Sequence, residues 1–293
     1  MDPRRLPADW PYRDAARHVI AGPHRWWVIE AGAATAPVVL LLHGLGASGH
    51  SFRHLIPGLS ATYRVIVPDL PGQGCTQMGA RGRSGLEPTA QDLRRLCDTL
   101  GQAPVAVIGH SAGGAIALQM ALDTPGLAVV GINAALSQFD GAAGVVFPRL
   151  AQGLAAMPFA ASLATLWASP RLVDRLLDGT GSEMEPEGRA QYRRLVQDAD
   201  HVRGALEMMA QWQLAPLLAR LETVTSPVLL IAAEDDRAVP PHVSEQAAAR
   251  IPGAALLRVA GGHLVHEEPG QALLTPILDW LRRHANPDQV RTG

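Results

Sequence analysis

The sequence predicts a doubly wound α/β fold, in which a mostly parallel sheet of about eight strands carries helices on both faces. Two observations support this prediction. Short apolar runs, of which Val38–Leu42 is the clearest, alternate along the chain with longer segments that suit helices, and a strand that is apolar throughout is typical of a parallel sheet covered on both sides. Glycine-rich or acidic turns follow several of these runs, and ligands of such sheets bind at the carboxyl ends of the strands.

The predicted strands begin with an edge hairpin, formed by residues 18–21 and 26–31 around the turn at Gly22 and Pro23. Further strands are expected at 38–42, 63–68, 105–108, 129–134, 227–232 and 255–259. Helices are expected from about residue 89 to 100, from 115 to 122 and from about 270 to 284.

The alternation of strands and helices stops between Ala134 and Thr225, where helical segments follow one another without a strand-like run. This position, after the sixth strand, is where a helical cap would cover the carboxyl ends of the strands. We therefore expect a core made of residues 1–136 and 226–293 and a cap, or lid, made of residues 137–225.

The first part of the expected cap is almost free of charge. Arg149 is the only charged residue between Gly141 and Pro170. One interpretation is ordinary helical core packed on the sheet, and the other is a lid whose underside lines a wide apolar pocket. On the second interpretation, the candidates for contact with substrate are Phe147, Met157, Trp167 and, later in the cap, Trp212.

Composition excludes several classes of function. All 25 basic residues are arginine, so Schiff-base and P-loop lysine chemistry are excluded, and the net charge of −2 argues against a nucleic-acid-binding surface. Cys75 and Cys97 are too few for a disulfide framework and lie in no metal-ligand pattern; neither a metal nor a cofactor is expected. The polar N-terminus and the lack of a long uninterrupted apolar run predict a cytoplasmic protein without a signal peptide or a transmembrane segment.

The strand at 105–108 runs directly into Gly109-His110-Ser111-Ala112-Gly113 and then into an alanine-rich segment suited to a helix. So sharp a turn strains its central residue, and it is possible only where glycines leave room on either side. The turn lifts the Ser111 hydroxyl clear of the sheet, at the positive end of the following helix. In this context the G-x-S-x-G pattern is typical of the nucleophile elbow of α/β-hydrolases. A serine here excludes dehalogenases and epoxide hydrolases, which use an aspartate at the elbow.

A serine nucleophile needs a base, and the base needs an acid that orients it; in this fold they follow the serine in the order acid, then histidine. The seventh predicted strand is followed by Glu234, Asp235 and Asp236. We choose Asp236, which begins an Asp-x-x-Val-Pro turn, with Asp235 as the alternative. His263 follows after enough chain for one crossover helix and one strand, and it is the expected general base. His266 is expected at the surface or in a supporting position.

Two backbone N–H groups are needed to stabilise the oxyanion of a tetrahedral intermediate. One is expected from Ala112, directly after Ser111, and the other from Leu45, in the glycine-rich loop after the strand at 38–42. His43 and His110 flank this site. Each either contacts substrate, positions a loop, or serves only as a structural hydrogen-bonding group.

A closer resemblance is carried by Asp9–Arg13, Pro68–Gly72, Leu177–Ser182, Gln191–Leu195 and His201–Trp212. These segments resemble the BchO family, α/β-hydrolase-fold proteins described as magnesium-chelatase accessory proteins of bacteriochlorophyll synthesis. The resemblance covers nearly the whole chain, including the cap, where unrelated hydrolases differ most. One departure is Gly44-Leu45-Gly46, where the family often has Gly-Thr-Gly; the backbone donor is kept, while contacts with substrate would change.

The resemblance implies a role at the magnesium-protoporphyrin branch of pigment synthesis. The first hypothesis is a serine hydrolase of the esterase type that acts on an amphipathic tetrapyrrole ester, with the magnesium chelatase as the implied partner. The second is a non-catalytic accessory that binds or carries a porphyrin in the same apolar pocket. The third is a general carboxylesterase or a C–C bond hydrolase. The implied location is the cytoplasm, at most peripheral to the photosynthetic membrane.

Overall fold

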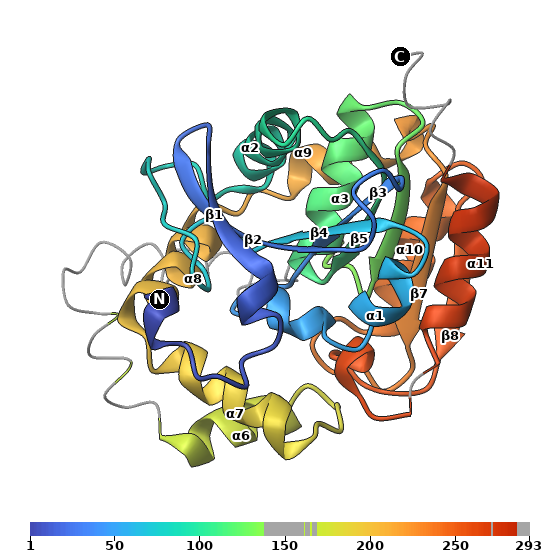
Figure 1. Ribbon diagram of the computed structural model, residues 1–293. Helices are drawn as coiled ribbons and strands as arrows, with labels where there is room; N and C mark the ends of the chain where they lie inside the picture. The colour runs from blue at the N-terminus through green and yellow to red at the C-terminus, as the bar shows by residue number, and fades with distance from the viewer. Residues whose placement is uncertain (138–160, 162–164, 166–168, 271, 286–293) are drawn as a thin grey trace.

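The computed structural model describes residues 1–137, 161, 165, 169–270 and 272–285. An eight-stranded sheet crosses the molecule (Figure 1), with the strand order β1-β2-β4-β3-β5-β6-β7-β8. The strands are β1 (Ala16–Ala21), β2 (His24–Ala31), β3 (Val38–Leu42), β4 (Arg64–Pro68), β5 (Pro104–His110), β6 (Ala128–Ile132), β7 (Val228–Ala233) and β8 (Ala255–Val259). β2 pairs antiparallel with β1 and with β4, and all other neighbours are parallel. The predicted mostly parallel sheet and its edge hairpin are therefore confirmed.

Helices cover both faces of this sheet. The α-helices bounded within the described residues are α1 (Ile56–Ser60), α2 (Leu86–Thr99), α3 (Ala112–Asp123), α6 (Pro170–Asp178), α7 (Pro186–Val196), α8 (Ala199–Gln211), α9 (Ala215–Leu218), α10 (Pro241–Arg250) and α11 (Leu274–His284). Short 3₁₀ turns are η1 (Pro3–Arg5), η2 (Arg13–Ala15), η3 (Gly49–Phe52), η4 (Leu221–Thr223) and η5 (Val265–Glu267). Residues of α2, α3, α9 and α10 pack on one face, and residues of α1 and α11 pack on the other.

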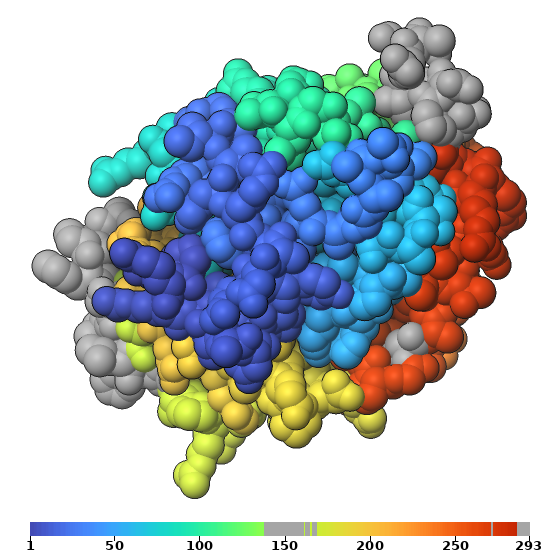
Figure 2. All heavy atoms as spheres, in the orientation of Figure 1, coloured from blue at the N-terminus to red at the C-terminus, as the bar shows by residue number. Residues whose placement is uncertain are grey.

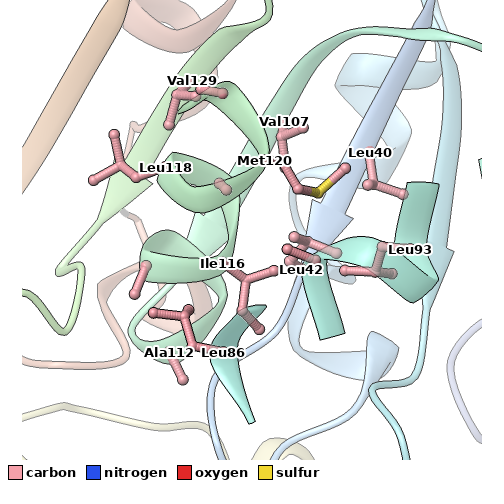
Figure 3. Packing of buried hydrophobic residues seen from close by; sticks show 14 of the residues in the cluster. Leu40, Leu42, Leu86, Leu93, Val107, Ala112, Ile116, Leu118, Met120 and Val129 are labelled. Atoms are coloured by element: carbon pink, nitrogen blue, oxygen red, sulfur yellow. The ribbon is translucent and has the colours of Figure 1, made fainter. Parts of the chain in front are cut away.

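The strand β3 shows why its sequence is apolar throughout. Leu40 and Leu42 belong to the core cluster under α2 and α3, whereas Val39 and Leu41 belong to the cluster under α1 and α11. Figure 3 shows Leu40 and Leu42 on the side of the sheet that α2 and α3 cover, with Ile116 of α3 close by. Because successive side chains of a strand point to opposite faces, a strand in the middle of such a sheet has no position left for a polar residue.

Several boundaries differ from the prediction, and at three of them the local backbone gives the reason. α2 begins at Leu86, not at residue 89, because Pro88 is tolerated in the first helical turn, where its missing N–H has no intrahelical partner. β6 ends before Asn133, whose φ of 46° lies outside the strand region. α11 begins at Leu274, after Gly270 with its φ of +76°.

Between β6 and β7 the described elements are helical: α6, α7, α8, α9 and the turn η4. This agrees with a helical cap inserted after the sixth strand, while the exact bounds 137–225 stay a prediction. The N-terminal segment packs against these helices, since Leu6 and Trp10 share a buried cluster with Leu177 and Leu195. Figure 2 shows the N-terminal residues (dark blue) lying directly against the cap helices (yellow and orange).

Candidate active site

Ser111 lies between β5 and α3 with a φ of 51° and a ψ of −115°, a positive-φ conformation that is strained for a residue with a side chain. At both glycines of the motif another part of the backbone lies too close to leave room for a side chain. A Cβ added to Gly109 would lie 2.2 Å from the carbonyl oxygen of Gly113, and one added to Gly113 would lie 2.1 Å from that of Leu42. The predicted strained turn from strand to helix is therefore present at the predicted residues.

The strained residue is held by hydrogen bonds on both sides. The Ser111 N–H donates to the carbonyl of Ile132 at 3.0 Å, and the Ser111 carbonyl accepts from Gly114 at 3.0 Å and from Ala135 at 2.9 Å. Two of these partners lie at and just beyond the end of β6, so the neighbouring strand stabilises the turn. The Ser111 side chain is left partly exposed, at the carboxyl ends of β5 and β6.

Asp236 and His263 come together as the sequence predicted. Asp236 Oδ2 lies 2.8 Å from His263 Nδ1, and its other oxygen accepts from the N–H groups of Ala238 at 2.8 Å and Val239 at 2.7 Å. The Asp236 carboxylate has no exposed surface, whereas Asp235 is exposed. Because a carboxylate only accepts, Nδ1 of His263 carries the proton and Nε2 presents its lone pair.

His263 also has its backbone fixed. Its carbonyl accepts from Asn133 Nδ2 at 2.9 Å and from His110 Nε2 at 2.8 Å, and its N–H donates to the carbonyl of Thr180 at 3.2 Å. Asn133 also accepts from the N–H of Ala233 at 2.8 Å and so ties the end of β7 to this turn. Asn133 was not among the predicted site residues; the signal available was a polar residue near the end of a buried apolar run.

The contact between the serine and the histidine is not formed. Within the part of the chain that the structure describes, Ser111 Oγ and His263 Nε2 form no hydrogen bond. Catalytic hydrogen bonds are often long in the absence of substrate and shorten when it binds. Gly44 brings the loop of residues 43–47, which we call the oxyanion loop, against Ser111: a Cβ added to Gly44 would lie 3.2 Å from Ser111 Cβ.

His43 fixes the peptide that contains the Leu45 N–H. The N–H of Leu70 donates to His43 Nε2 at 2.9 Å, so Nδ1 must carry the proton, and it donates to the carbonyl of Gly44 at 2.8 Å. That carbonyl and the Leu45 N–H belong to one peptide group. Among the described residues, neither the Leu45 N–H nor the Ala112 N–H has an acceptor, so both are free to bind a developing oxyanion.

For three histidines the structure favours one of the alternatives left open by the sequence. His43 and His110 are 0% and 2% exposed and bond to backbone groups; this burial favours loop positioning or structural hydrogen bonding over contact with substrate. Of the two alternatives for His266, the structure favours the supporting position over the surface, because the residue is 3% exposed and its ring lies 4.3 Å from that of His110 and 5.4 Å from that of Phe52. An isolated histidine in a turn carries no periodic pattern from which its burial can be predicted.

Of the four remaining pocket candidates, the structure describes Trp212. Trp212 follows α8 and is partly buried against the core cluster that also contains Ala112. Phe147, Met157 and Trp167 lie outside the described residues. Asp69, which was not among the predicted site residues, accepts from the N–H groups of Gly49 and Cys75, each at 2.7 Å.

The buried histidines predict acid sensitivity. Burial lowers the pKa of His43 and of His266 to about 3 and that of His201 to about 4. It also lowers the pKa values of His50 and His110 well below the ordinary value of 6.5. These residues are neutral in the folded protein, whereas an unfolded chain binds a proton at each of them below about pH 6.5. Their stabilising effect is therefore complete above pH 6.5 and is lost as the pH falls.

Two buried carboxyls oppose this trend. Burial raises the pKa of Asp69 to about 6 and also raises that of Glu267, so the folded protein binds protons there that the unfolded chain does not. The five histidines outnumber these two carboxyls, so unfolding near pH 5 should take up protons on balance. Urea titrations at pH 7.5, 6 and 5 should give a falling free energy of unfolding. A value that stays constant or rises toward pH 5 would contradict these histidine environments.

Within the described ranges, no three His, Cys, Asp or Glu side chains are grouped in a way that could hold a metal ion. None of the described helices has the length and apolar character needed to cross a membrane.

Comparison with known proteins gives a consistent result. Residues 37–269 match the alpha/beta hydrolase fold family. The chain is 60% identical over 282 residues to the magnesium-chelatase 30 kDa subunit of Rhodobacter capsulatus, covering 96% of this chain and 99% of that protein. It is 26% identical to a 2-hydroxy-6-oxononadienedioate/2-hydroxy-6-oxononatrienedioate hydrolase of Cupriavidus pinatubonensis, covering 85% and 88%. The enol-lactonase structure from Burkholderia xenovorans LB400 superposes with a TM-score of 0.74 at 20% identity, over 91% of this chain and all of that one, a likeness of fold alone.

Proposed function

Since the chain belongs to the α/β-hydrolase fold family, we propose that it is a serine hydrolase that cleaves a carboxylic ester through Ser111, His263 and Asp236. The observation that carries the proposal is the 2.8 Å contact between His263 Nδ1 and the buried carboxylate of Asp236. It leaves Nε2 as the unprotonated nitrogen, which is the form that a general base needs. The strained, partly exposed Ser111 supplies the nucleophile.

In this mechanism His263 Nε2 takes the proton of Ser111 as its oxygen attacks the ester carbonyl. The tetrahedral oxyanion accepts hydrogen bonds from the N–H groups of Leu45 and Ala112. His263 then gives the proton to the leaving alcohol, and an acyl group remains on Ser111. A water molecule, deprotonated by His263, then attacks the carbonyl carbon of the acyl group. The bond to Ser111 breaks, the acid is released, and His263 returns the proton to the Ser111 oxygen. Asp236 stays ionised throughout and stabilises the imidazolium.

For the substrate we propose an amphipathic tetrapyrrole ester. The 60% identity to the magnesium-chelatase 30 kDa subunit extends over the cap as well as the core and agrees with the resemblance to the BchO family. The apolar cap stretch would supply adaptable methionine and aromatic walls for a flat macrocycle. On this proposal the protein is an accessory of the chelatase, and contact between the two proteins is part of the proposal.

A fluorophosphonate probe tests the proposed activity, since labelling requires an activated serine. The wild-type protein should be labelled at Ser111, and prior incubation with a substrate ester should protect it. Turnover of a porphyrin methyl ester and of p-nitrophenyl butyrate should be compared in the same preparation. Faster turnover of the porphyrin ester supports the tetrapyrrole assignment, and turnover of the small ester alone supports a general carboxylesterase. The absence of both labelling and turnover would refute the hydrolase proposal.

The name of the relative from Rhodobacter capsulatus favours a second candidate, a non-catalytic accessory that binds or carries a porphyrin. This candidate predicts saturable porphyrin binding without labelling or turnover. The relative from Cupriavidus pinatubonensis favours a third candidate, a C–C bond hydrolase, at a lower identity of 26%. Hydrolysis of a vinylogous diketone in place of an ester would support it.

Porphyrin binding is itself a prediction. Adding protoporphyrin should quench tryptophan fluorescence to a saturable limit, because the macrocycle would lie near Trp167 and Trp212. A parallel titration of N-acetyltryptophanamide corrects for absorption by the porphyrin. Phe147→Asp or Met157→Asp, chosen from the sequence, should weaken binding by placing a charge against an apolar ligand.

The control for this titration is Trp280→Phe. Trp280 belongs to α11 and is buried on the opposite face of the sheet from Trp212, so its removal should leave the saturable quenching in place. Two results would identify the apolar stretch as ordinary core: no saturable quenching, or Asp variants that unfold.

A further inference from the structure

We infer that His201, on the cap helix α8, is a positioning residue that orients the oxyanion loop together with Gln73. The inference rests on the proposed function, since it concerns the loop that carries the Leu45 N–H. The position of α8 against the core then affects the geometry of the oxyanion hole. Neither residue touches the reacting atoms; both act through the backbone of Gly46.

Both polar groups of Gly46 are held by side chains from outside the loop. The Gly46 N–H donates to Gln73 Oε1 at 2.7 Å, and the Gly46 carbonyl accepts from His201 Nε2 at 3.1 Å. Gly46 has a φ of +77°, and the Ala47 N–H donates to the Gly44 carbonyl at 3.2 Å, so residues 44–47 form a tight turn. Fixing the peptides on both sides of Gly46 leaves the Leu45 N–H little freedom to rotate.

The direction of the His201 contact is determined by its other nitrogen. The N–H of Gly74 donates to His201 Nδ1 at 2.9 Å. A backbone N–H can only donate, so Nδ1 is the acceptor and Nε2 carries the proton that Gly46 receives. His201 is 1% exposed, and burial keeps its ring neutral because its pKa is lowered to about 4.

The buried face of α8 is built for this contact. Its buried residues are His201, Gly204 and Met208, which lie on one side of a helix because they are three and four residues apart. A Cβ added to Gly204 would lie 2.0 Å from the carbonyl oxygen of Gly72, so only glycine permits the approach. Gln73 Nε2 contacts Met208 Sδ at 3.1 Å. Each of the three residues therefore contacts the loop of residues 69–76, and His201 also contacts the oxyanion loop.

A cap that leaves this position withdraws the donor from Gly46 and loosens the turn that carries Leu45. The oxyanion hole is then complete only while α8 is seated. Through His201 and Gln73 the cap affects the oxyanion loop, although the two are far apart in the sequence. Contacts between substrate and the cap can therefore alter the position of the Leu45 N–H.

Two substitutions of His201 separate its two hydrogen bonds. In His201→Asn, the side-chain amide reaches the position of Nδ1 and keeps the acceptor for Gly74, but it is too short to donate to Gly46. In His201→Gln, the amide nitrogen reaches the position of Nε2 and keeps the donor to Gly46. If the contact with Gly46 matters, His201→Asn should lower kcat for p-nitrophenyl butyrate by about 10- to 100-fold, less than the loss of a whole oxyanion donor, with KM almost unchanged. His201→Gln should retain most of the wild-type kcat.

Phenylboronic acid supplies a readout that a merely structural role would not change. It forms a tetrahedral adduct on the serine, with one boron-bound oxygen in the oxyanion hole, so its affinity should fall in parallel with kcat in His201→Asn and be retained in His201→Gln. Gln73→Met, which removes the acceptor for Gly46 at similar volume, should behave like His201→Asn. It also keeps the test available if His201→Asn does not fold.

The outcomes are distinguishable. If the wild-type protein hydrolyses the ester while folded His201→Asn and Gln73→Met keep its kcat and boronate affinity, the inference is overturned and the proposed function stands. A fall in kcat with unchanged boronate affinity also overturns it. If the wild-type protein neither turns over the ester nor binds the boronate, the proposed function fails first and the inference fails with it.

Discussion

Ser111→Ala is expected to abolish fluorophosphonate labelling and to lower ester turnover by about 10⁶-fold, since loss of a serine nucleophile removes the covalent route altogether. The fold should be kept, because alanine retains the Cβ and therefore the same backbone strain at a φ of 51°. The hydrogen bonds that hold this residue come from its backbone and from Ile132 and Ala135, and the substitution changes none of them.

Ser226→Ala is the matched control for this variant. Ser226 is 2% exposed, and its hydroxyl has no hydrogen-bond partner among the described residues, so its removal should change neither labelling nor turnover. Labelling should be followed by mass spectrometry of the modified peptide, and folding by the urea midpoint. If Ser111→Ala keeps wild-type turnover in a sample free of host esterases, another residue performs the chemistry.

The parts of the fold that were predictable depend on local pattern. The bounds of β3 were predicted correctly, because a strand covered on both faces has an uninterrupted apolar run. The elbow was predictable because Gly109 and Gly113 stand where a side chain would collide with the backbone. The whole motif lies within five consecutive residues. The resemblance to the BchO family, which depends on short segments in both core and cap, is confirmed by the relative that shares 60% of its residues.

The parts that were not predictable depend on contacts between distant residues. His201 and Gly46 are 155 positions apart, and nothing in the local sequence of either indicates the other. Asn133 joins the ends of β6 and β7 to the turn that carries His263, a role that appears only when the strands are placed side by side. The substrate is not determined by the fold at all, because one fold serves many reactions and specificity resides in the residues of the site.

Asp236→Asn is expected to lower turnover by about 10⁴-fold while the protein stays folded. The carboxamide oxygen can still accept from the N–H groups of Ala238 and Val239, which preserves the turn. The remaining amide nitrogen donates where the carboxylate accepted. His263 must then place its proton on Nε2, the nitrogen that has to receive the proton of Ser111, so the base is present in the wrong tautomer.

Asp235→Asn is the control, because Asp235 is the neighbouring acid and its side chain is exposed. Its backbone N–H donates to the Gly261 carbonyl at 2.9 Å, a contact that the substitution keeps, so turnover should stay near the wild-type value. Both variants should be compared by kcat at constant pH, with near-ultraviolet circular dichroism as the check on tertiary structure. The reverse result, a large loss in Asp235→Asn and little in Asp236→Asn, would move the acid by one residue. It would also mean that the contact between Asp236 and His263 does not orient the base during turnover.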